Sequence, residues 1–312
     1  MEQSRRDFLK KAGLAALSAG LIPGFACQNN NGKKLFFEIS LAEWSLHRTL
    51  REGKLDNLDF AATAKNEFGI DIIEYVNQFF KDKAEDTNYL KELLQRSKDN
   101  GVRNHLIMID GEGGLGDTDE AARTQAIENH YKWVEAAKYL ECATIRVNAY
   151  GVGSAEDVAV AAVDGLGRLG EFASKVGINV IVENHGGYSS NGTWLSNVMK
   201  QVNLPNVGTL PDFGNFCIQR DPNDWKICVE EYDRYQGTKE LMPFAKGVSA
   251  KSYDFDANGD VVETDYRRML QVVKDSGFRG IIGIEFEGDS VSEYEGIKAT
   301  KAALERIGAE IS

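Results

Sequence analysis

Three acidic residues in the second half of the chain stand where short apolar runs end. They are Glu183, Asp212 and Glu285, and each follows a run typical of a buried strand. An ionisable group in such a place is costly unless it is paired or bound to a cation. Converging carboxylates repel one another, and a divalent cation is the simplest way to hold them together. Oxygen ligands with a possible imidazole favour Mn or Mg, and less strongly Zn.

A lysine and a histidine accompany these acids. Lys251 lies in the apolar run 247–252, where an ammonium group needs an anionic or carbonyl partner. His185 follows Glu183 by two residues. Taken alone, each acid is equally well explained as a helix N-cap or as a surface group that begins a loop. The presence of all three on separate runs, with His185 beside one of them, favours a common metal site.

Other polar residues that lie on the predicted strands or just past them are candidates to bind a substrate. The candidates are Trp44, His47, Glu74, His105, Asn148, His185 and Asn215. The first two, just past the first run, would give a sugar a stacking surface and a proton donor. A strand histidine such as His105 is more often a hydrogen-bonded core residue. Arg146, on the same strand face as Asn148, is also explained by an ion pair with Glu74 or Glu183.

Eight strands alternate with helices from residue 35 onward, a pattern of βα units around a parallel sheet. The predicted strands are 35–40, 71–76, 102–109, 144–148, 179–184, 207–212, 247–252 and 281–286. The predicted helices include 57–68, 89–100, 121–140, 155–176, 194–202, 265–276 and 294–307. The fold class is therefore α/β, a (β/α)8 TIM barrel in a single domain over residues 35–312. Active sites of such barrels form at the carboxyl ends of the strands, where the three acids lie.

A doubly wound open sheet is the alternative fold. No GxGxxG follows the first strand, which disfavours a nucleotide-binding version. The glycine-rich segment 111–116 follows the third strand instead, and it carries an acid and no Lys, Ser or Thr. We interpret it as a mobile loop over the site and not as a phosphate cradle.

The first 27 residues predict a twin-arginine-type signal peptide. Arg5 and Arg6 precede an apolar run rich in Ala, Leu and Gly that is too short to span a membrane. Cys27 begins a possible lipoprotein junction, with cleavage after Ala26 as the alternative, and residues 28–34 form a polar tether. We expect an exported protein, periplasmic or lipid-anchored in a bacterial envelope, with any membrane contact made only through Cys27. An ordinary amphipathic first helix is the other interpretation.

Composition excludes several classes of partner. The chain has 312 residues and a net charge of −12, and removal of the signal makes it more acidic. Nucleic-acid binding depends on Lys and Arg, so no nucleic-acid partner is expected. The four Cys form no CxxC pair, so neither a zinc knuckle nor a disulfide framework is indicated. A homo-oligomer is possible.

Four segments together resemble the xylose isomerase-like superfamily, and within it the sugar phosphate isomerase/epimerase proteins. In order they read Val-Glu-Asn-His-Gly-Gly, Asp-Phe-Gly-Asn-Phe, Ala-Lys-Ser and Gly-Ile-Glu-Phe-Glu-Gly. The resemblance covers residues 35–312 and implies a divalent metal (Mn, Mg or Zn) held by Glu183, Asp212 and Glu285. It also implies that Glu183 and Glu285 exchange protons with carbons beside a substrate carbonyl.

Two positions depart from the pattern of that family. Ser249 and Asn215 stand where the family commonly has a metal-binding His and a second His, which would weaken the metal site. We expect a sugar isomerase or epimerase acting on an unphosphorylated sugar or keto-sugar, with Glu183, Glu285 and Lys251 as catalytic residues. A lyase or hydratase on an oxidised (keto) glycoside and a non-catalytic sugar-binding protein are the alternatives.

Overall fold

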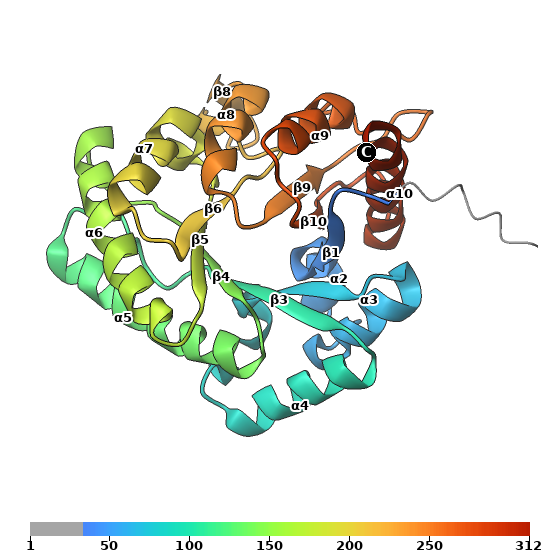
Figure 1. Cartoon of the computed structure of the whole chain (residues 1–312), viewed down its shortest axis with the longest axis horizontal. Helices are drawn as coiled ribbons and strands as arrows, with labels where there is room; N and C mark the ends of the chain where they lie inside the picture. The colour runs from blue at the N-terminus through green and yellow to red at the C-terminus, as the bar shows by residue number, and fades with distance from the viewer. Residues whose placement is uncertain (1–33) are drawn as a thin grey trace, which may run out of the picture. The chain divides into compact units, whose positions relative to one another are not determined.

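The computed structural model describes residues 34–312, and Figure 1 draws them as a coloured ribbon. The signal peptide, Cys27 and all but the last residue of the tether lie outside the described residues. The statements made about them above stay predictions.

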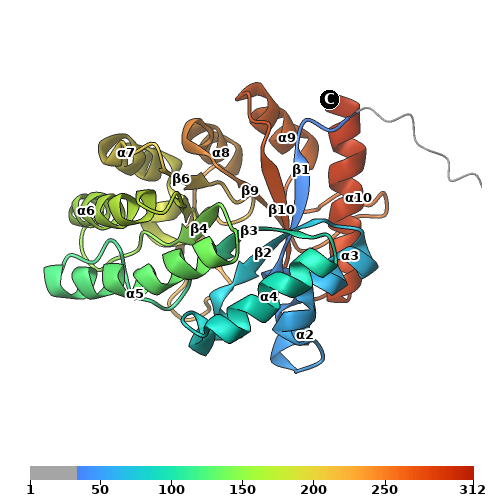
Figure 2. The ribbon, with the colours of Figure 1, turned by 60° about the horizontal axis from the view of Figure 1, so that its bottom comes forward.

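Eight parallel strands form one sheet in the order β6-β5-β4-β3-β2-β1-β10-β9. The strands are β1 (Glu38–Ala42), β2 (Ile72–Val76), β3 (Arg103–Met108), β4 (Thr144–Val147), β5 (Asn179–Glu183), β6 (Val207–Leu210), β9 (Val248–Ser252) and β10 (Ile281–Phe286). Isolated bridges from Thr209 to Ala245 and from Asp212 to Ser249 join β6 to β9 and close the barrel. The predicted (β/α)8 TIM barrel is confirmed, and Figures 1 and 2 show its strands surrounded by helices.

The helices pack outside the barrel, and all of them except α2 and α3 begin at a residue whose side chain caps the first turn. They are α2 (His47–Arg51), α3 (Phe60–Phe68), α4 (Thr87–Asp99), α5 (Glu120–Tyr139), α6 (Ala155–Ser174), α7 (Gly192–Val202), α8 (Arg234–Leu241), α9 (Tyr266–Asp275) and α10 (Glu293–Ile311). Short 3-10 helices are η1 (Glu43–Leu46), η2 (Asn57–Asp59), η3 (Asn77–Lys83), η4 (Gly187–Ser190) and η5 (Met242–Phe244). Asp119 caps α5 and Ser292 caps α10, each accepting a backbone N–H that the first turn leaves unpaired. Within residues 34–312, no helix is long and apolar enough to span a membrane.

Most observed elements lie within a few residues of the predicted ones. The first strand begins at Glu38 and not at residue 35, because Phe37 packs against α10 near Gly308 before the strand starts. The sequence patterns do not predict α8, which is short and has little apolar periodicity. They also do not predict an antiparallel hairpin of β7 (Cys217–Arg220) and β8 (Cys228–Glu231) between Asp212 and α8.

The expectation that the cysteines form no disulfide is wrong for one pair. Cys217 and Cys228 are disulfide-bonded across the hairpin, with their Cα atoms 5.8 Å apart. Antiparallel pairing of β7 and β8 brings the two thiols together, although they are 11 residues apart in sequence and show no CxxC spacing. Cys142 is a buried free thiol.

The glycine-rich segment 111–116 is anchored, contrary to its interpretation as a mobile loop over the site. Glu112 accepts a hydrogen bond of 2.7 Å from the Trp133 indole and lies 3.0 Å from the Lys132 ammonium group. Leu115 is fully buried. Contacts with α5 therefore fix this segment, and only Gly111 at its start lines a cavity over the site.

The interior of the barrel divides into a small apolar part and a larger polar part. One cluster of buried apolar side chains is separate from the core that lies between strands and helices: Ala42, Val76, Leu106, Met108, Ile181 and Leu210. Polar side chains occupy much of the remaining interior and are at most 3% exposed: Ser40, Glu74, Arg146, Glu183, Asp212, Ser249, Lys251 and Glu285. So many buried ionisable groups are stable only with partners, and those partners define the site.

Gly283 of β10 tests how tightly the polar interior is packed. A Cβ on this residue would lie 2.8 Å from both carboxylate oxygens of Glu74. Gly283→Ala should therefore displace Glu74 and lower the free energy of unfolding by about 1–3 kcal/mol, as measured by urea unfolding.

Gly167→Ala is the matched control, because a Cβ there would meet no described atom within 4 Å. Alanine has a higher helix propensity than glycine, so the free energy of unfolding of this variant should rise by about 0.5–1 kcal/mol. A Gly283→Ala protein as stable as the parent would contradict the packing described here.

Candidate functional site

Three buried carboxylates converge near the carboxyl ends of the strands. Glu183 ends β5, Asp212 follows β6, and Glu285 lies near the end of β10. One oxygen of each lies within 4.8 Å of the others, and the three side chains are buried. The barrel closes through Pro211, which has no N–H to donate, and Ser249 donates its N–H to the Pro211 carbonyl at 2.9 Å. Asp212 therefore stands at the irregular seam between β6 and β9.

Arg146 and Asn215 hold the Glu183 carboxylate. Arg146 Nε lies 2.8 Å from Glu183 Oε2, and Asn215 donates to Oε1 at 2.8 Å. Arg146 also donates to Asp110 at 2.7 Å, as does Asn148 at 2.8 Å. Burial raises the pKa of Glu183 to about 7, although the guanidinium of Arg146 opposes the shift. Glu183 thus has the pKa of a group that can take up and release a proton near neutrality.

Ser249 connects the other two carboxylates. Its hydroxyl lies 2.6 Å from Asp212 Oδ2 and 3.0 Å from Glu285 Oε2, and it can donate to either. Asp212 Oδ1 accepts the backbone N–H groups of Gly214 and Asn215, both at 2.8 Å. Burial nevertheless raises the pKa of Asp212 to about 7.

Lys251 forms a buried ion pair with Glu285. Its Nζ lies 2.7 Å from Glu285 Oε1 and 3.3 Å from Glu287 Oε1. Burial alone would raise the pKa of Glu285, but attraction to Lys251 and the hydrogen bond from it outweigh burial and lower that pKa. Burial likewise opposes the charge of Lys251, and Glu285 and Glu287 outweigh it and raise the lysine pKa. The anionic partner predicted for this lysine is thus Glu285.

Glu74 on β2 is a fourth buried acid. It accepts a hydrogen bond of 2.6 Å from Ser40, and burial raises its pKa to about 8. Against these four buried acids, the only buried Lys or Arg side chains among residues 34–312 are Arg146 and Lys251. The interior therefore holds an excess of acid, which requires bound protons or a bound cation.

The converging carboxylates fit a divalent cation. Glu183 Oε2 contacts Arg146 Nε at 2.8 Å but accepts no well-oriented hydrogen bond from the described residues. Both Glu183 and Asp212 can lose a proton near neutral pH. All-oxygen ligation suits a hard cation such as Mg or Mn. Over residues 34–312 these three acids are the only such cluster, and His185 is not a member of it. A cation would compete with Lys251 for Glu285.

Two adjoining cavities lie over the carboxylates. The inner one encloses about 350 Å³ and is lined by Trp44, Gln78, Asp110, Gly111, Arg146, Asn148, Tyr150, His185, Glu285 and Glu287. The outer one encloses about 750 Å³ and extends from Lys251 to the β7–β8 hairpin. Trp44, His185 and Glu287 line both. Both volumes lie in the range of small-molecule sites, roughly 300–1,000 Å³.

A family model for the xylose isomerase-like TIM barrel matches residues 60–309. The chain belongs to the xylose isomerase-like TIM barrel family. This finding confirms the resemblance inferred from the four motifs. No curated protein sequence matches the chain.

Solved structures from the family share this fold at low sequence identity. The IOLI protein with a bound zinc atom has a TM-score of 0.68 at 15% identity, over 88% of this chain and 98% of its own. The 3-keto-D-glucoside 4-epimerase of E. coli has a TM-score of 0.65 at 15% identity, over 88% and 100% of the chains. A sugar phosphate isomerase/epimerase from Parabacteroides distasonis has 0.63 at 17% identity, over 91% and 98%. Other similar structures include D-psicose 3-epimerase and a probable 3-DHS dehydratase.

The structure brings most of the predicted site residues together. Trp44 and His47 stack with their rings 5.0 Å apart and line the outer cavity. His185 and Asn148 line the inner cavity, and Asn215 contacts Glu183. Glu74 lies inside the barrel near the other buried acids, which raise its pKa further.

His105 is not part of this arrangement. It lies beside Gly247, the residue before β9, and so at the opposite end of the strands from the carboxylates. Burial lowers its pKa to about 4, so it is neutral in the folded protein. The core interpretation of this histidine agrees with its position better than a substrate-binding role does.

Sequence reasoning missed several residues of this candidate site. Asp110 joins Arg146 and Asn148, and it directly follows the predicted third strand, where the rule applied to the other acids would have found it. Glu287 pairs with Lys251 and accepts a hydrogen bond from the Trp44 indole. Arg220 and Trp225 come from the hairpin, which carries no strand signal in the sequence.

Glu74 should make stability depend on pH. Its pKa is about 8 in the folded protein, against a normal value of 4.5, so the folded state holds a proton that the unfolded state releases. This stabilisation is complete below the normal pKa and is lost as the pH rises through about 8. In EDTA, the decline between pH 5 and pH 8 should be shallower for Glu74→Gln, by at most about 1.4 kcal/mol per pH unit.

Urea unfolding at four pH values measures this effect. Glu171→Gln, on the exposed face of α6, is the control and should follow the parent protein. Parallel curves for Glu74→Gln and the parent would show that Glu74 does not carry the proton.

Metal binding should strengthen as the pH rises. Glu183 and Asp212 must lose protons to become ligands, so the affinity for Mn²⁺ or Mg²⁺ should rise between pH 6 and pH 8. Calorimetric titration of the EDTA-treated protein measures the affinity. Asp212→Asn should abolish binding, whereas Asp289→Asn, an exposed acid at the rim of the outer cavity, should not. Equal binding by both variants would place the cation elsewhere.

Proposed function

We propose that this protein is a divalent-metal-dependent enzyme that isomerises or epimerises an unphosphorylated sugar or keto-sugar. The observation that carries the proposal is the convergence of Glu183, Asp212 and Glu285 beneath a cavity of sugar-binding size. Glu183 and Glu285 come from β5 and β10, which are separated by β6 and β9 around the barrel. Two carboxylates held on different strands can remove a proton from one face of a substrate carbon and return it to the other.

Glu183 is suited to be the general base. Without a cation its pKa lies near 7, so this buried carboxyl group can both hold and release a proton close to neutral pH. Arg146 and Asn215 fix the orientation of the carboxylate. A positioned base of this kind contributes about 10²–10⁴-fold to a rate.

Glu285 and Lys251 supply the second proton-transfer position. Because the pKa of Glu285 is lowered, it is ionised and can accept a proton. Because the pKa of Lys251 is raised, it stays a charged ammonium group that can donate a hydrogen bond to a substrate oxygen. When a cation is bound by Glu183, Asp212 and Glu285, it would polarise a carbonyl and make the adjacent C–H more acidic. Ser249 keeps Asp212 and Glu285 aligned.

The charge of the inner cavity supports an unphosphorylated substrate. Asp110, Glu285 and Glu287 line this cavity, and its one cation, Arg146, is already paired with Asp110 and Glu183. A phosphate group would meet a negative surface here. An exported protein, as predicted from residues 1–27, would also meet sugars that carry no phosphate.

Elimination is the second candidate reaction, and Lys251 is the observation that favours it. A buried ammonium beside Glu285 and Glu287 can protonate a departing oxygen on the carbon next to the one that loses its proton. In that reaction a carboxylate takes the proton, a C=C bond forms, and the C–O bond breaks. A lyase would release an unsaturated keto-sugar and the departing group, whereas an epimerase would form a single product that is a stereoisomer of the substrate.

Glu183→Gln and Glu285→Gln should each lower turnover by about 10²-fold or more, because neither amide can exchange a proton with carbon. Incubation in D₂O with a panel of ketoses and keto-glucosides measures the reaction as deuterium incorporation beside the carbonyl. Unsaturated products in the same assay identify elimination.

Glu171→Gln is the matched control, and circular dichroism should show all three variants folded. Normal turnover in both site variants would rule out this mechanism. Sugar binding by the parent protein without deuterium exchange would favour the non-catalytic alternative.

A further inference from the structure

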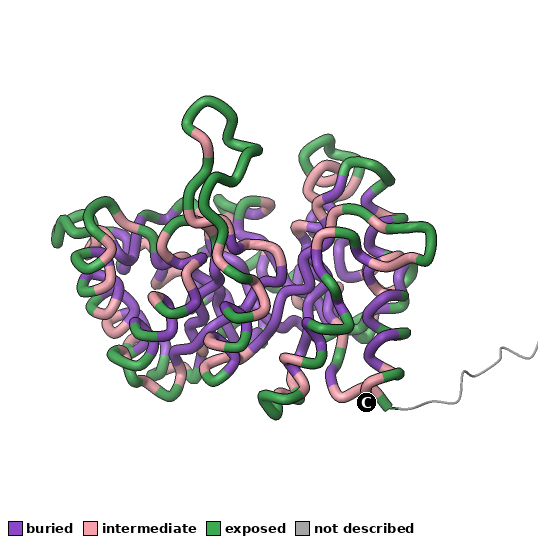
Figure 3. The backbone as a smooth tube through the Cα atoms, turned by 90° about the horizontal axis from the view of Figure 1, so that it is seen from above, coloured by how far each residue is buried: buried purple, intermediate pink, exposed green. Residues whose placement is uncertain are grey.

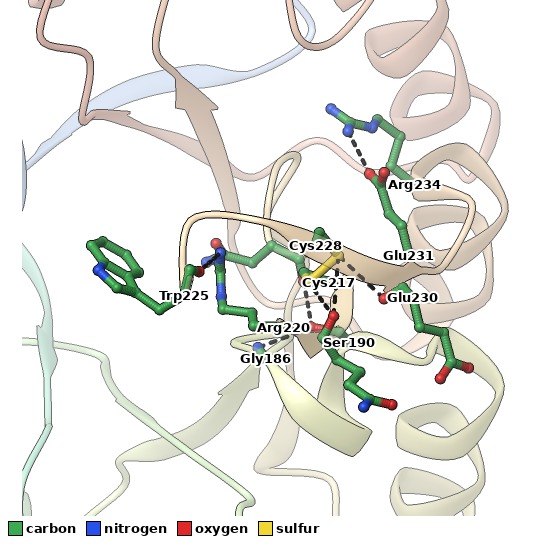
Figure 4. Close-up of a disulfide and its surroundings, with 11 residues drawn as sticks. Gly186, Ser190, Cys217, Arg220, Trp225, Cys228, Glu230, Glu231 and Arg234 are labelled. Atoms are coloured by element: carbon green, nitrogen blue, oxygen red, sulfur yellow. Dashed lines mark hydrogen bonds and ion pairs between the residues drawn. A yellow bond between two sulfur atoms is a disulfide. The ribbon is translucent and has the colours of Figure 1, made fainter. Parts of the chain in front are cut away.

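The β7–β8 hairpin forms the outer wall of the larger cavity. Figure 3 shows it projecting from the barrel as an exposed loop, and Figure 4 shows the Cys217–Cys228 disulfide across it. The hairpin starts beside Asn215, which donates to Glu183, and Tyr232 donates its N–H to the Phe216 carbonyl at 2.9 Å. The disulfide and this bond fix the base of the hairpin next to the carboxylates.

Trp225 is a large, solvent-exposed aromatic side chain at the tip of the hairpin. It is 70% exposed, yet it lines the same cavity as Trp44 and Lys251. Arg220 donates to the Trp225 carbonyl at 2.9 Å, and its guanidinium lies 5.9 Å from the centre of the indole ring. An exposed tryptophan at a cavity wall is a typical ligand contact, because its flat face gains contact area at little cost in conformational entropy.

The two cavities provide room for two linked rings. They share Trp44, His185 and Glu287, so a molecule that occupies the inner cavity can continue into the outer one. The inner cavity, with Asp110, Arg146 and Asn148, is bordered by hydrogen-bonding groups. The outer one has an indole at its far side and the hairpin cations Arg220 and Lys226 beside it. The difference in lining suits a reacting sugar in the inner cavity and a ring stacked on an indole in the outer cavity.

We propose that the hairpin is a second sugar subsite in which Trp225 stacks on the ring attached to the reacting sugar. The substrate is therefore a glycoside of at least two rings. This inference rests on the proposed function and adds its substrate class. In an epimerisation the outer ring stays attached, and in an elimination it is the leaving group.

Calorimetry with disaccharides and their component monosaccharides tests the proposal. The panel is cellobiose, maltose, trehalose, lactose and melibiose, each also as its C3-keto derivative, with the Mn²⁺-loaded full-length protein. At least one disaccharide should bind about tenfold or more tightly than its monosaccharides. Trp225→Ala should remove this difference and leave monosaccharide binding unchanged, and Trp225→Phe should keep most of it.

Two further variants separate stacking from other effects. Val229→Ala is the matched control, since Val229 is 53% exposed on the same hairpin but does not line the outer cavity. The double change Cys217→Ser and Cys228→Ser should weaken disaccharide binding more than monosaccharide binding, because it loosens the hairpin that carries Trp225.

Three results would overturn the proposal. In the first, no disaccharide binds more tightly than its monosaccharides. In the second, Trp225→Ala weakens both classes equally. In the third, Trp225→Ala changes the oligomeric state in sedimentation without changing sugar affinity, which would make the hairpin a subunit contact. Failure of the proposed function would give a different result. The parent protein would then show no deuterium exchange but would still bind a disaccharide more tightly than its monosaccharides.

Discussion

Inside the barrel the acidic side chains outnumber the basic ones, and the neutralisation of this buried charge determines how the site is built. Arg146 is shared between Glu183 and Asp110, and Lys251 pairs with Glu285. These pairs leave Asp212 with hydrogen bonds alone and Glu74 with one serine. Because burial disfavours the remaining negative charge, the pKa values of several of these carboxyls are raised toward neutrality. The same imbalance gives the site both its affinity for protons and its fit to a cation.

Ser249 links two of the buried carboxylates. A serine in this position joins two carboxylates through one hydroxyl, and the adjacent Lys251 adds a positive charge within the protein. Lys251 therefore neutralises part of the negative charge of the buried carboxylates. A cation that binds here would meet carboxylates whose charge is already partly compensated, and Lys251 would compete with it for Glu285.

Particular residues show how far sequence reasoning reaches. The positions of Glu183, Asp212 and Glu285 followed from strand endings alone, because carboxyl ends of parallel strands meet on one face. Asp110 obeys the same rule. His105 also lies on a strand, but near its beginning, and strand membership does not reveal at which end a side chain lies. The Cys217–Cys228 disulfide was not predicted, because the segment between β6 and α8 has no apolar alternation that would indicate strands. The pairing of the two cysteines depends on contacts made only after folding.

The sequence by itself determined the βα order, the barrel class and the set of acids at the strand ends, since these follow from local periodicity and from burial. Only the tertiary structure decided which cation faces which acid, where His105 lies and what the β7–β8 hairpin covers. Those outcomes depend on distances between segments far apart in the chain, and on the depth at which each charge is buried. Both quantities arise from closure of the barrel, and local sequence patterns do not encode them.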